Sequence, residues 1–159
     1  MLLTRRDWIF GGTAVAVTLS ACGKASAKKT VYEFTLTDAQ WRQRLSPAAY
    51  QTLRHEATER PFTSALNKEK RKGVFACAGC ALPLFASATK YDSGTGWPSF
   101  WKPLANAVGE KTDTLLGFPR TEVHCRRCGG HLGHVFDDGP APTGKRYCMN
   151  GVAMRFTAL

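Results

Sequence analysis

Two pairs of cysteines with C-x-x-C spacing constrain the fold of this chain most strongly. Cys77 and Cys80 form the first pair, Cys125 and Cys128 form the second, and residues 81–124 separate them. A C-x-x-C turn points two thiolates at one place, so two such turns complete the tetrahedral four-sulfur site of structural zinc. Because the separation exceeds the spacing within one zinc finger, we expect a single zinc ion to join distant segments of the fold.

Two other uses of these cysteines are open. In an oxidising compartment the four thiols could form two disulfides. A thioredoxin-like redox role is the other alternative, although it calls for a βαβ context that the sequence does not offer. Gly129 directly follows the second pair and suits the tight turn of a metal knuckle. The sequence therefore favours zinc in a closed structural site, without a coordination position for substrate.

The N-terminus is typical of an export signal over residues 1–21. Arg5 and Arg6 precede an apolar run at residues 8–19, and that run is too short to span a bilayer. The stretch TRRDWIF resembles a twin-arginine signal. That route would carry the domain folded and already loaded with metal.

Cys22 closes the stretch LSAC, which resembles a bacterial lipobox whose cysteine becomes the lipidated N-terminus. Cleavage after Ala27, which would remove Cys22, is the alternative. We expect residues 22–36 to form an anchor and linker, and residues 37–159 to form one domain. The expected location is the periplasmic side of a bacterial cell envelope, at the membrane through the lipid anchor.

Charge argues against one class of partner. The chain has 159 residues, with 22 Lys plus Arg against 12 Asp plus Glu, for a net charge of +10. The basic residues are scattered and not set in a stripe with stacking aromatics, so nucleic acid is not an expected partner. The excess favours attraction to anionic surfaces. We expect a tethered monomer.

Local patterns predict two short helices followed by short strands. A threonine or aspartate at residues 37–38 caps the first helix, Pro47 begins the second, and Pro61 ends it. Beyond Gly73, short apolar runs alternate with Gly, Pro, Asp and Asn. This texture predicts antiparallel sheets.

Cys148, in the stretch GKRYCMNG, is left unpaired once the other cysteines are assigned. Such a cysteine is either buried and inert or a reactive thiol. On a strand, alternation places Arg146, Cys148 and Asn150 on one face. A nearby cation stabilises the thiolate, which is the form that attacks.

His131 and His134 flank a Leu-Gly turn in the stretch HCRRCGGHLGHVF. They could be further metal ligands, but four thiolates already fill a zinc site. They could also be ordinary buried polar residues. Near a thiolate, imidazoles supply protons at neutral pH, and this is the use we favour.

Three motifs in order resemble the B-type methionine sulfoxide reductases, which reduce the R epimer of methionine sulfoxide: SGTGWPSF, HCRRCGGHLGHVFDDGP and GKRYCMNG. The resemblance runs from about residue 37 to residue 156 and includes TLTDAQWR and ATERPF. It implies a mainly β fold of the β-tent type, with two antiparallel sheets, short N-terminal helices and zinc between the knuckles. It also implies oxidised methionine residues in proteins as substrates.

The resemblance implies a role for each matching residue. Cys148 corresponds to the nucleophile that attacks the sulfoxide sulfur, and Trp97 and Phe136 to aromatic walls around the substrate methyl group. The zinc ligands of many members correspond to the four paired cysteines. The polar groups that hold and protonate the sulfoxide oxygen and tune the thiolate correspond to His131, His134, Arg146 and Asn150.

Thr95 departs from the family pattern. Many members carry a cysteine there, which attacks the sulfenic acid on the nucleophile to form a disulfide. A threonine has no such chemistry, so we expect an external thiol, thioredoxin-like or glutaredoxin-like, to reduce Cys148 directly. Two rival functions stay open: a membrane-anchored zinc-binding interaction module without catalysis, and a thiol-disulfide oxidoreductase that uses the C-x-x-C pairs.

Overall fold

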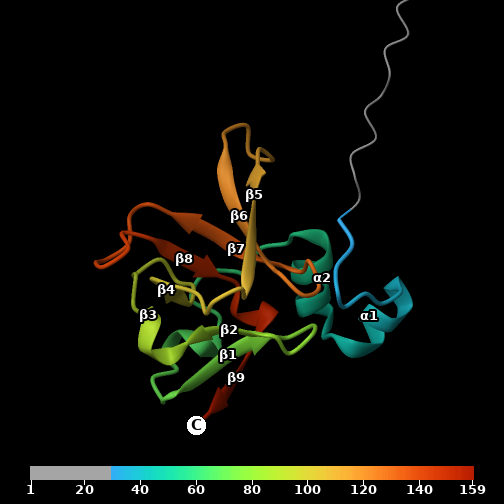
Figure 1. The fold of residues 1–159 in the computed structure, drawn as a ribbon, viewed down its shortest axis with the longest axis horizontal. Helices are drawn as coiled ribbons and strands as arrows, with labels where there is room; N and C mark the ends of the chain where they lie inside the picture. The colour runs from blue at the N-terminus through green and yellow to red at the C-terminus, as the bar shows by residue number, and fades with distance from the viewer. Residues whose placement is uncertain (1–29) are drawn as a thin grey trace, which may run out of the picture. The chain divides into compact units, whose positions relative to one another are not determined.

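The computed structural model describes residues 30–159. The predicted export signal, Cys22 and the first part of the predicted linker lie outside the described residues. Within the described part, nine strands form two antiparallel sheets, with strand orders β2-β1-β9 and β3-β4-β8-β7-β6-β5 (Figure 1). This confirms the predicted mainly β fold with two antiparallel sheets.

The strands are short and, like the helices, are set close together along the chain. The strand bounds are β1 Gly73–Cys77, β2 Pro83–Ala86, β3 Lys90–Tyr91, β4 Ser99–Phe100, β5 Val108–Asp113, β6 Arg120–Cys125, β7 His131–Phe136, β8 Arg146–Met149 and β9 Met154–Ala158. The helices are α1 Asp38–Arg44 and α2 Pro47–His55, with short 3-10 turns η1 Ala65–Lys68, η2 Ser87–Thr89 and η3 Gly151–Ala153.

Both helices begin as the sequence predicts. Thr37 caps α1 through a reciprocal capping box with Gln40, and Ser46 caps α2 with Pro47 in the first turn. The end of α2 differs from the prediction. It ends at His55, well before Pro61, because Glu56 adopts a left-handed conformation (φ 57°) that turns the chain toward the sheet.

Aromatic side chains form the core between the sheets. Phe75 of β1, Phe85 of β2 and Phe100 of β4 are fully buried. The rings of Phe85 and Phe100 stack at 4.3 Å between centroids, and Phe75 meets Phe100 edge-on at 5.0 Å. Figure 1 shows the two helices beside the sheets, where α2 contacts β7 and η3.

The segment that precedes α1 packs against the rest of the domain. The Phe34 backbone N–H donates to the Arg127 carbonyl at 2.9 Å, and the Phe34 ring packs edge-on against Trp41. Residues 32–36, placed in the linker by sequence, thus lie against the turn that carries the second cysteine pair. Within residues 30–159, the helices lack the length and apolar character that crossing a bilayer requires.

The register of the six-stranded sheet aligns six residues in what we call the central row. In-register neighbours point to the same face of a sheet. From β3 across to β5, the row consists of Tyr91, Ser99, Cys148, His134, Glu122 and Lys111.

Candidate active site and cysteine cluster

Cys148 lies in the middle of the central row, with Ser99 of β4 on one side and His134 of β7 on the other. Its side chain is partly exposed and is not joined to another cysteine. Directly opposed residues on neighbouring strands hold their Cβ atoms roughly 5 Å apart. The sheet therefore places a partly exposed thiol next to an imidazole.

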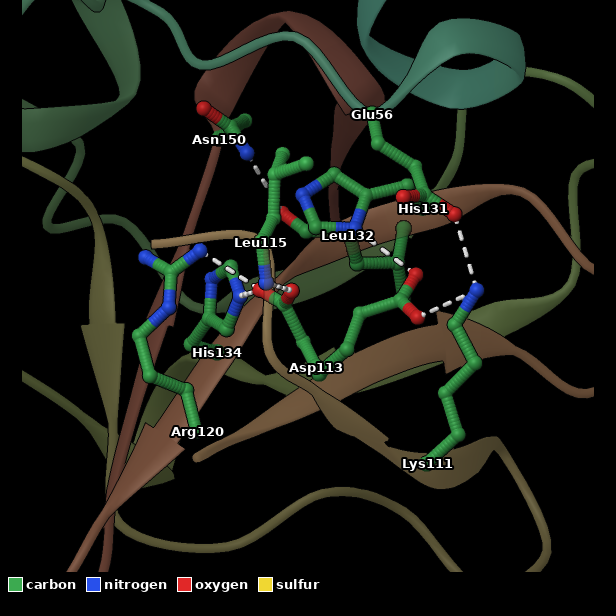
Figure 2. A network of polar contacts seen from close by, with 10 residues as sticks. Glu56, Lys111, Asp113, Leu115, Arg120, His131, Leu132, His134 and Asn150 are labelled. Atoms are coloured by element: carbon green, nitrogen blue, oxygen red, sulfur yellow. Dashed lines mark hydrogen bonds and ion pairs between the residues drawn. The ribbon is translucent and has the colours of Figure 1, made fainter. Parts of the chain in front are cut away.

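His131 and His134 each contact a carboxylate from the neighbouring hairpin. His131 Nδ1 lies 2.8 Å from Glu122 Oε1, and His134 Nε2 lies 2.8 Å from Asp113 Oδ2. The two imidazole rings are 5.4 Å apart. Figure 2 shows His131 and His134 close together, with Arg120 against Asp113 and Lys111 paired with Glu56. The two carboxylates therefore hold both imidazole rings in place.

Burial keeps both histidines neutral near neutral pH. Desolvation lowers the pKa of His131 to about 4. It also lowers the pKa of His134, and the Asp113 carboxylate opposes that shift. A neutral ring that donates to a carboxylate through one nitrogen presents the other as an acceptor. In His131 that nitrogen, Nε2, is buried and without a hydrogen-bond partner in the structure.

Arg146 and Phe136 form one wall of the site. They are in-register partners across β8 and β7. The Arg146 guanidinium binds both oxygens of Asp138 at 2.8 Å and lies 4.4 Å from the centre of the Phe136 ring. Because alternate residues of a strand share a face, Arg146 and Cys148 lie on the same side of β8. The guanidinium that was predicted to stand near the thiol is therefore on the same face of the sheet.

Glu59, a residue without a predicted role, holds Trp97 in place. The Trp97 indole N–H donates to the Glu59 carbonyl at 2.8 Å. The Glu59 backbone N–H donates to Asn150 Oδ1 at 2.8 Å, and its carboxylate accepts from the Gly151 backbone at 2.6 Å. Glu59 thus ties the tryptophan to the segment directly after Cys148.

Asn150 is committed to the scaffold. Besides its contact with Glu59, its amide donates through Nδ2 to the Leu132 carbonyl at 3.1 Å, and the side chain is buried. The resemblance implied that Asn150 helps to hold the sulfoxide oxygen. In the structure its amide joins the loop that contains Glu59 to Leu132 of β7.

The acidic partners of the site could not be identified from the sequence. Each meets its partner across a strand pair or from a loop, and such pairings form only in the folded chain. Alternation within TEVHC and the repeated Asp in VFDDGP were the available signals. These partners are Glu59, Asp113, Glu122 and Asp138.

The four paired cysteines converge, as predicted. Their sulfur atoms all lie within 4.8 Å of one another, with 3.7 Å between Cys77 and Cys128 and 3.5 Å between Cys80 and Cys125. A disulfide needs about 2.05 Å between sulfurs. Thiolates at about 2.3 Å around one tetrahedral ion stand about 3.8 Å apart. The arrangement can hold a metal ion, and it is consistent with structural zinc.

Both C-x-x-C turns have the same pattern of backbone hydrogen bonds. The Cys77 N–H donates to the Leu82 carbonyl and the Ala81 N–H to the Cys77 carbonyl, both at 2.9 Å. The second turn repeats this at 2.8 Å, from Cys125 to Gly130 and from Gly129 to Cys125. Cys77 ends β1 and Cys125 ends β6, so the cluster joins the two sheets.

Comparison with known proteins agrees with this geometry. A model of the SelR domain matches residues 45–158. The peptide methionine sulfoxide reductase MsrB of Leptospira interrogans is 50% identical over 126 residues, covering 79% of this chain and 96% of the relative. That of Thiobacillus denitrificans is 55% identical over 121 residues, covering 76% and 92%. That of Methanosarcina barkeri is 52% identical over 121 residues, covering 76% and 85%.

The matched region contains Cys148, both histidines and all four paired cysteines. The matches extend over most of the chain and nearly all of the two bacterial relatives. This chain therefore belongs to the SelR-domain family, the MsrB-type peptide methionine sulfoxide reductases.

Proposed function

We propose that this protein is an enzyme that reduces methionine R-sulfoxide in proteins to methionine, with Cys148 as the nucleophile. Family membership supports the reaction. The observation that carries the role of Cys148 is its place in the central row: a partly exposed thiol between Ser99 and a carboxylate-bound histidine. Free methionine sulfoxide is a further possible substrate of the same site.

The chemistry balances on Cys148 alone. The thiolate sulfur attacks the electrophilic sulfoxide sulfur, the sulfoxide S–O bond breaks, and the oxygen ends on the cysteine as sulfenic acid. The methionine sulfur gains the two electrons that the cysteine sulfur loses. The thiol proton finishes on the transferred oxygen, so no outside acid is consumed.

The two histidines carry that proton. Oxygen is a poor leaving group unless it is protonated. His131 is neutral and presents Nε2 as an acceptor, so it suits a role that takes the thiol proton and delivers it to the oxygen. Glu122 holds the ring and stabilises the transient imidazolium. Asp113 does the same for His134.

Trp97 and Phe136 recognise the methyl group of the substrate. Thioether contacts with aromatic rings stabilise by about 1 kcal/mol, and the attraction grows as the sulfur gains cationic character. The Glu59 contact fixes the indole, and the Arg146 guanidinium covers the Phe136 ring. Two fixed walls select one epimer, because the methyl and the oxygen then have separate places.

An external thiol completes the cycle. A first thiol condenses with the Cys148 sulfenic acid, releasing water and leaving a mixed disulfide, and a second restores the Cys148 thiol. Thr95 cannot resolve the sulfenic acid itself. The Thr95→Cys variant tests this step: a sulfur at the Thr95 position should form a disulfide with Cys148 after one turnover, which the natural protein should not form.

The metal in the cysteine cluster is zinc in this proposal, one ion held by Cys77, Cys80, Cys125 and Cys128. Its contribution is structural, since four thiolates close the coordination sphere. Elemental analysis of the purified protein tests it. One zinc per chain is expected, and two disulfides on an intact-mass measurement would contradict it.

We also propose a cellular location, from the sequence pattern of the N-terminus. A twin-arginine signal, with Cys22 as the lipidated residue, would place residues 37–159 on the periplasmic side of the envelope, as a monomer acting on oxidised envelope proteins. Fractionation tests this proposal. The natural protein should appear with membranes, and a Cys22→Ser variant should not.

One assay tests the reductase proposal. The purified protein with dithiothreitol receives each epimer of a dabsylated methionine sulfoxide, and product is followed by chromatography. Consumption of the R epimer, with the S epimer untouched, is expected. Unchanged R epimer would overturn the proposal and favour an interaction module. Activity that survives Cys148→Ser but not Cys77→Ser would point instead to the C-x-x-C pairs.

A further inference from the structure

Three hydroxyl side chains in the segment 93–99 form a chain that ends on the Cys148 sulfur. Ser99 Oγ lies 2.7 Å from Ser93 Oγ, and Ser93 Oγ lies 2.8 Å from Thr95 Oγ1. Thr95 Oγ1 lies 3.8 Å from Cys148 Sγ, within hydrogen-bonding distance for sulfur. At the other end, the Ser99 hydroxyl donates to the Trp97 carbonyl at 3.1 Å.

The number of hydrogens sets the direction of this chain. Each hydroxyl carries one hydrogen and so can donate only once. When Ser99 donates to the Trp97 carbonyl, Ser93 must donate to Ser99, and Thr95 must donate to Ser93. Thr95 can then only accept at the sulfur, which suits a Cys148 thiol and not a thiolate.

Ionisation of Cys148 removes one hydrogen from this set. Four contacts, from Trp97 through the three hydroxyls to the sulfur, are then served by three hydrogens. A hydrogen bond to a charged acceptor is roughly twice as strong as a neutral one. The contact given up is therefore the one to the Trp97 carbonyl, and all three hydroxyls turn toward the sulfur.

We propose that Thr95 is a catalytic residue that donates a hydrogen bond to the Cys148 thiolate, and that Ser93 and Ser99 are positioning residues that supply this donor by reversing direction. The proposal rests on the proposed function in that Cys148 is the nucleophile. Ser99 is fully buried and faces Cys148 across the β4–β8 pair, so the sheet fixes the inner part of the chain.

The proposal gives Thr95 a purpose where many family members have a cysteine. A cysteine at this position offers a second thiol for the sulfenic acid. The threonine instead donates a hydrogen bond to the attacking sulfur. It therefore assists the attack by Cys148, although it cannot resolve the sulfenic acid that the attack leaves. A Thr95→Val substitution keeps the shape of the side chain and removes the donor.

The test is the rate of Cys148 alkylation by iodoacetamide in the full-length protein, with modification of the Cys148 peptide followed by mass spectrometry. Relative to the natural protein, Thr95→Val should lower the rate of Cys148 alkylation at neutral pH roughly tenfold, because the attacking thiolate loses its hydrogen-bond donor. Ser93→Ala should lower the rate by less. Thr95→Ser, which keeps the hydroxyl, should leave the rate within about twofold of the natural one.

Thr112→Val is the matched control, because Thr112 is an exposed strand residue of β5, and it should leave Cys148 unchanged. A Thr95→Val protein whose Cys148 is alkylated at the natural rate would overturn the proposal. So would a Thr95→Ser protein slowed as far as Thr95→Val, since packing and not the hydroxyl would then be responsible. Alkylation needs no sulfoxide, so failure of the reductase assay is a separate result.

Discussion

The cysteine cluster and Cys148 place the same functional group in opposite surroundings. The four cluster thiols are buried, point at one another and sit in two turns with identical hydrogen bonds. Cys148 is partly exposed, lies on a strand, and has hydroxyl and imidazole neighbours. A thiol enclosed by other thiols binds metal and is unavailable for attack, whereas a thiol beside a donor and a base is ready for it.

The strongest test of this contrast is Cys148→Ser. A hydroxyl is a far weaker nucleophile than a thiolate, so R-sulfoxide reduction should fall by at least about a thousandfold. Metal content and the midpoint of urea unfolding should stay close to those of the natural protein. Turnover that persists in this variant would mean that the chemistry belongs elsewhere.

Cys125→Ser should have the reverse profile. Loss of one ligand from a closed metal site removes binding energy that is also folding energy, so the free energy of unfolding should fall by at least about 3 kcal/mol. Zinc content should fall with it. If the variant keeps its stability and loses turnover, the cluster is a redox centre and the contrast is wrong.

Acid should lower the free energy of unfolding because His131, in the candidate active site, is buried in its neutral form. The pKa of His131 is lowered to about 4 by burial, whereas an unperturbed histidine titrates near 6.5. Between these values the unfolded chain binds a proton that the folded chain does not. The stabilisation is complete above about pH 6.5 and is lost as the pH falls toward about 4, by ~3 kcal/mol in total.

Urea unfolding at several pH values compares the natural protein with His131→Gln, which can still donate to Glu122. The variant should lack most of this loss of stability between about pH 6.5 and pH 4. Equal slopes for the two proteins would show that His131 does not titrate as its burial implies.

We expect the smallest effect on stability from substitutions that compare the two C-x-x-C turns. Equivalent positions are occupied by Ala81 at φ 61° and Gly129 at φ 67°. A left-handed backbone strains alanine and not glycine, so Ala81→Gly should stabilise the protein by about 0.5 kcal/mol. Gly129→Ala should destabilise it by more, because a Cβ there would collide with the Tyr32 ring. Thermal unfolding measures both, and a change of the same sign in both would contradict the equivalence of the turns.

Local features of the fold could be predicted from sequence, and pairings could not. The capping residues of both helices and the convergence of the C-x-x-C pairs follow from short motifs whose physics is local. The end of α2 at His55 was missed, because it depends on Glu56 entering a left-handed conformation that no nearby glycine announces. The order of strands in the larger sheet depends on long-range packing.

The site shows the same division. Cys148, the histidines and Trp97 could be named because they lie in recognisable motifs. Glu122 and Glu59 could not be assigned, because their partners His131 and Trp97 reach them only after the sheet and the loop at residues 57–62 have formed. The hydroxyl chain through Ser93 was likewise invisible without the distances between its oxygens.

A single turnover without reductant is the sharpest test of Cys148 as a nucleophile that works without a second cysteine of the chain. The full-length protein receives an equimolar amount of a methionine R-sulfoxide peptide, and dimedone traps sulfenic acid before digestion and mass spectrometry. We expect one equivalent of methionine and the dimedone adduct on Cys148, with no disulfide linking Cys148 to another cysteine of the chain. An internal disulfide at Cys148, or methionine formed without any change at Cys148, would contradict it.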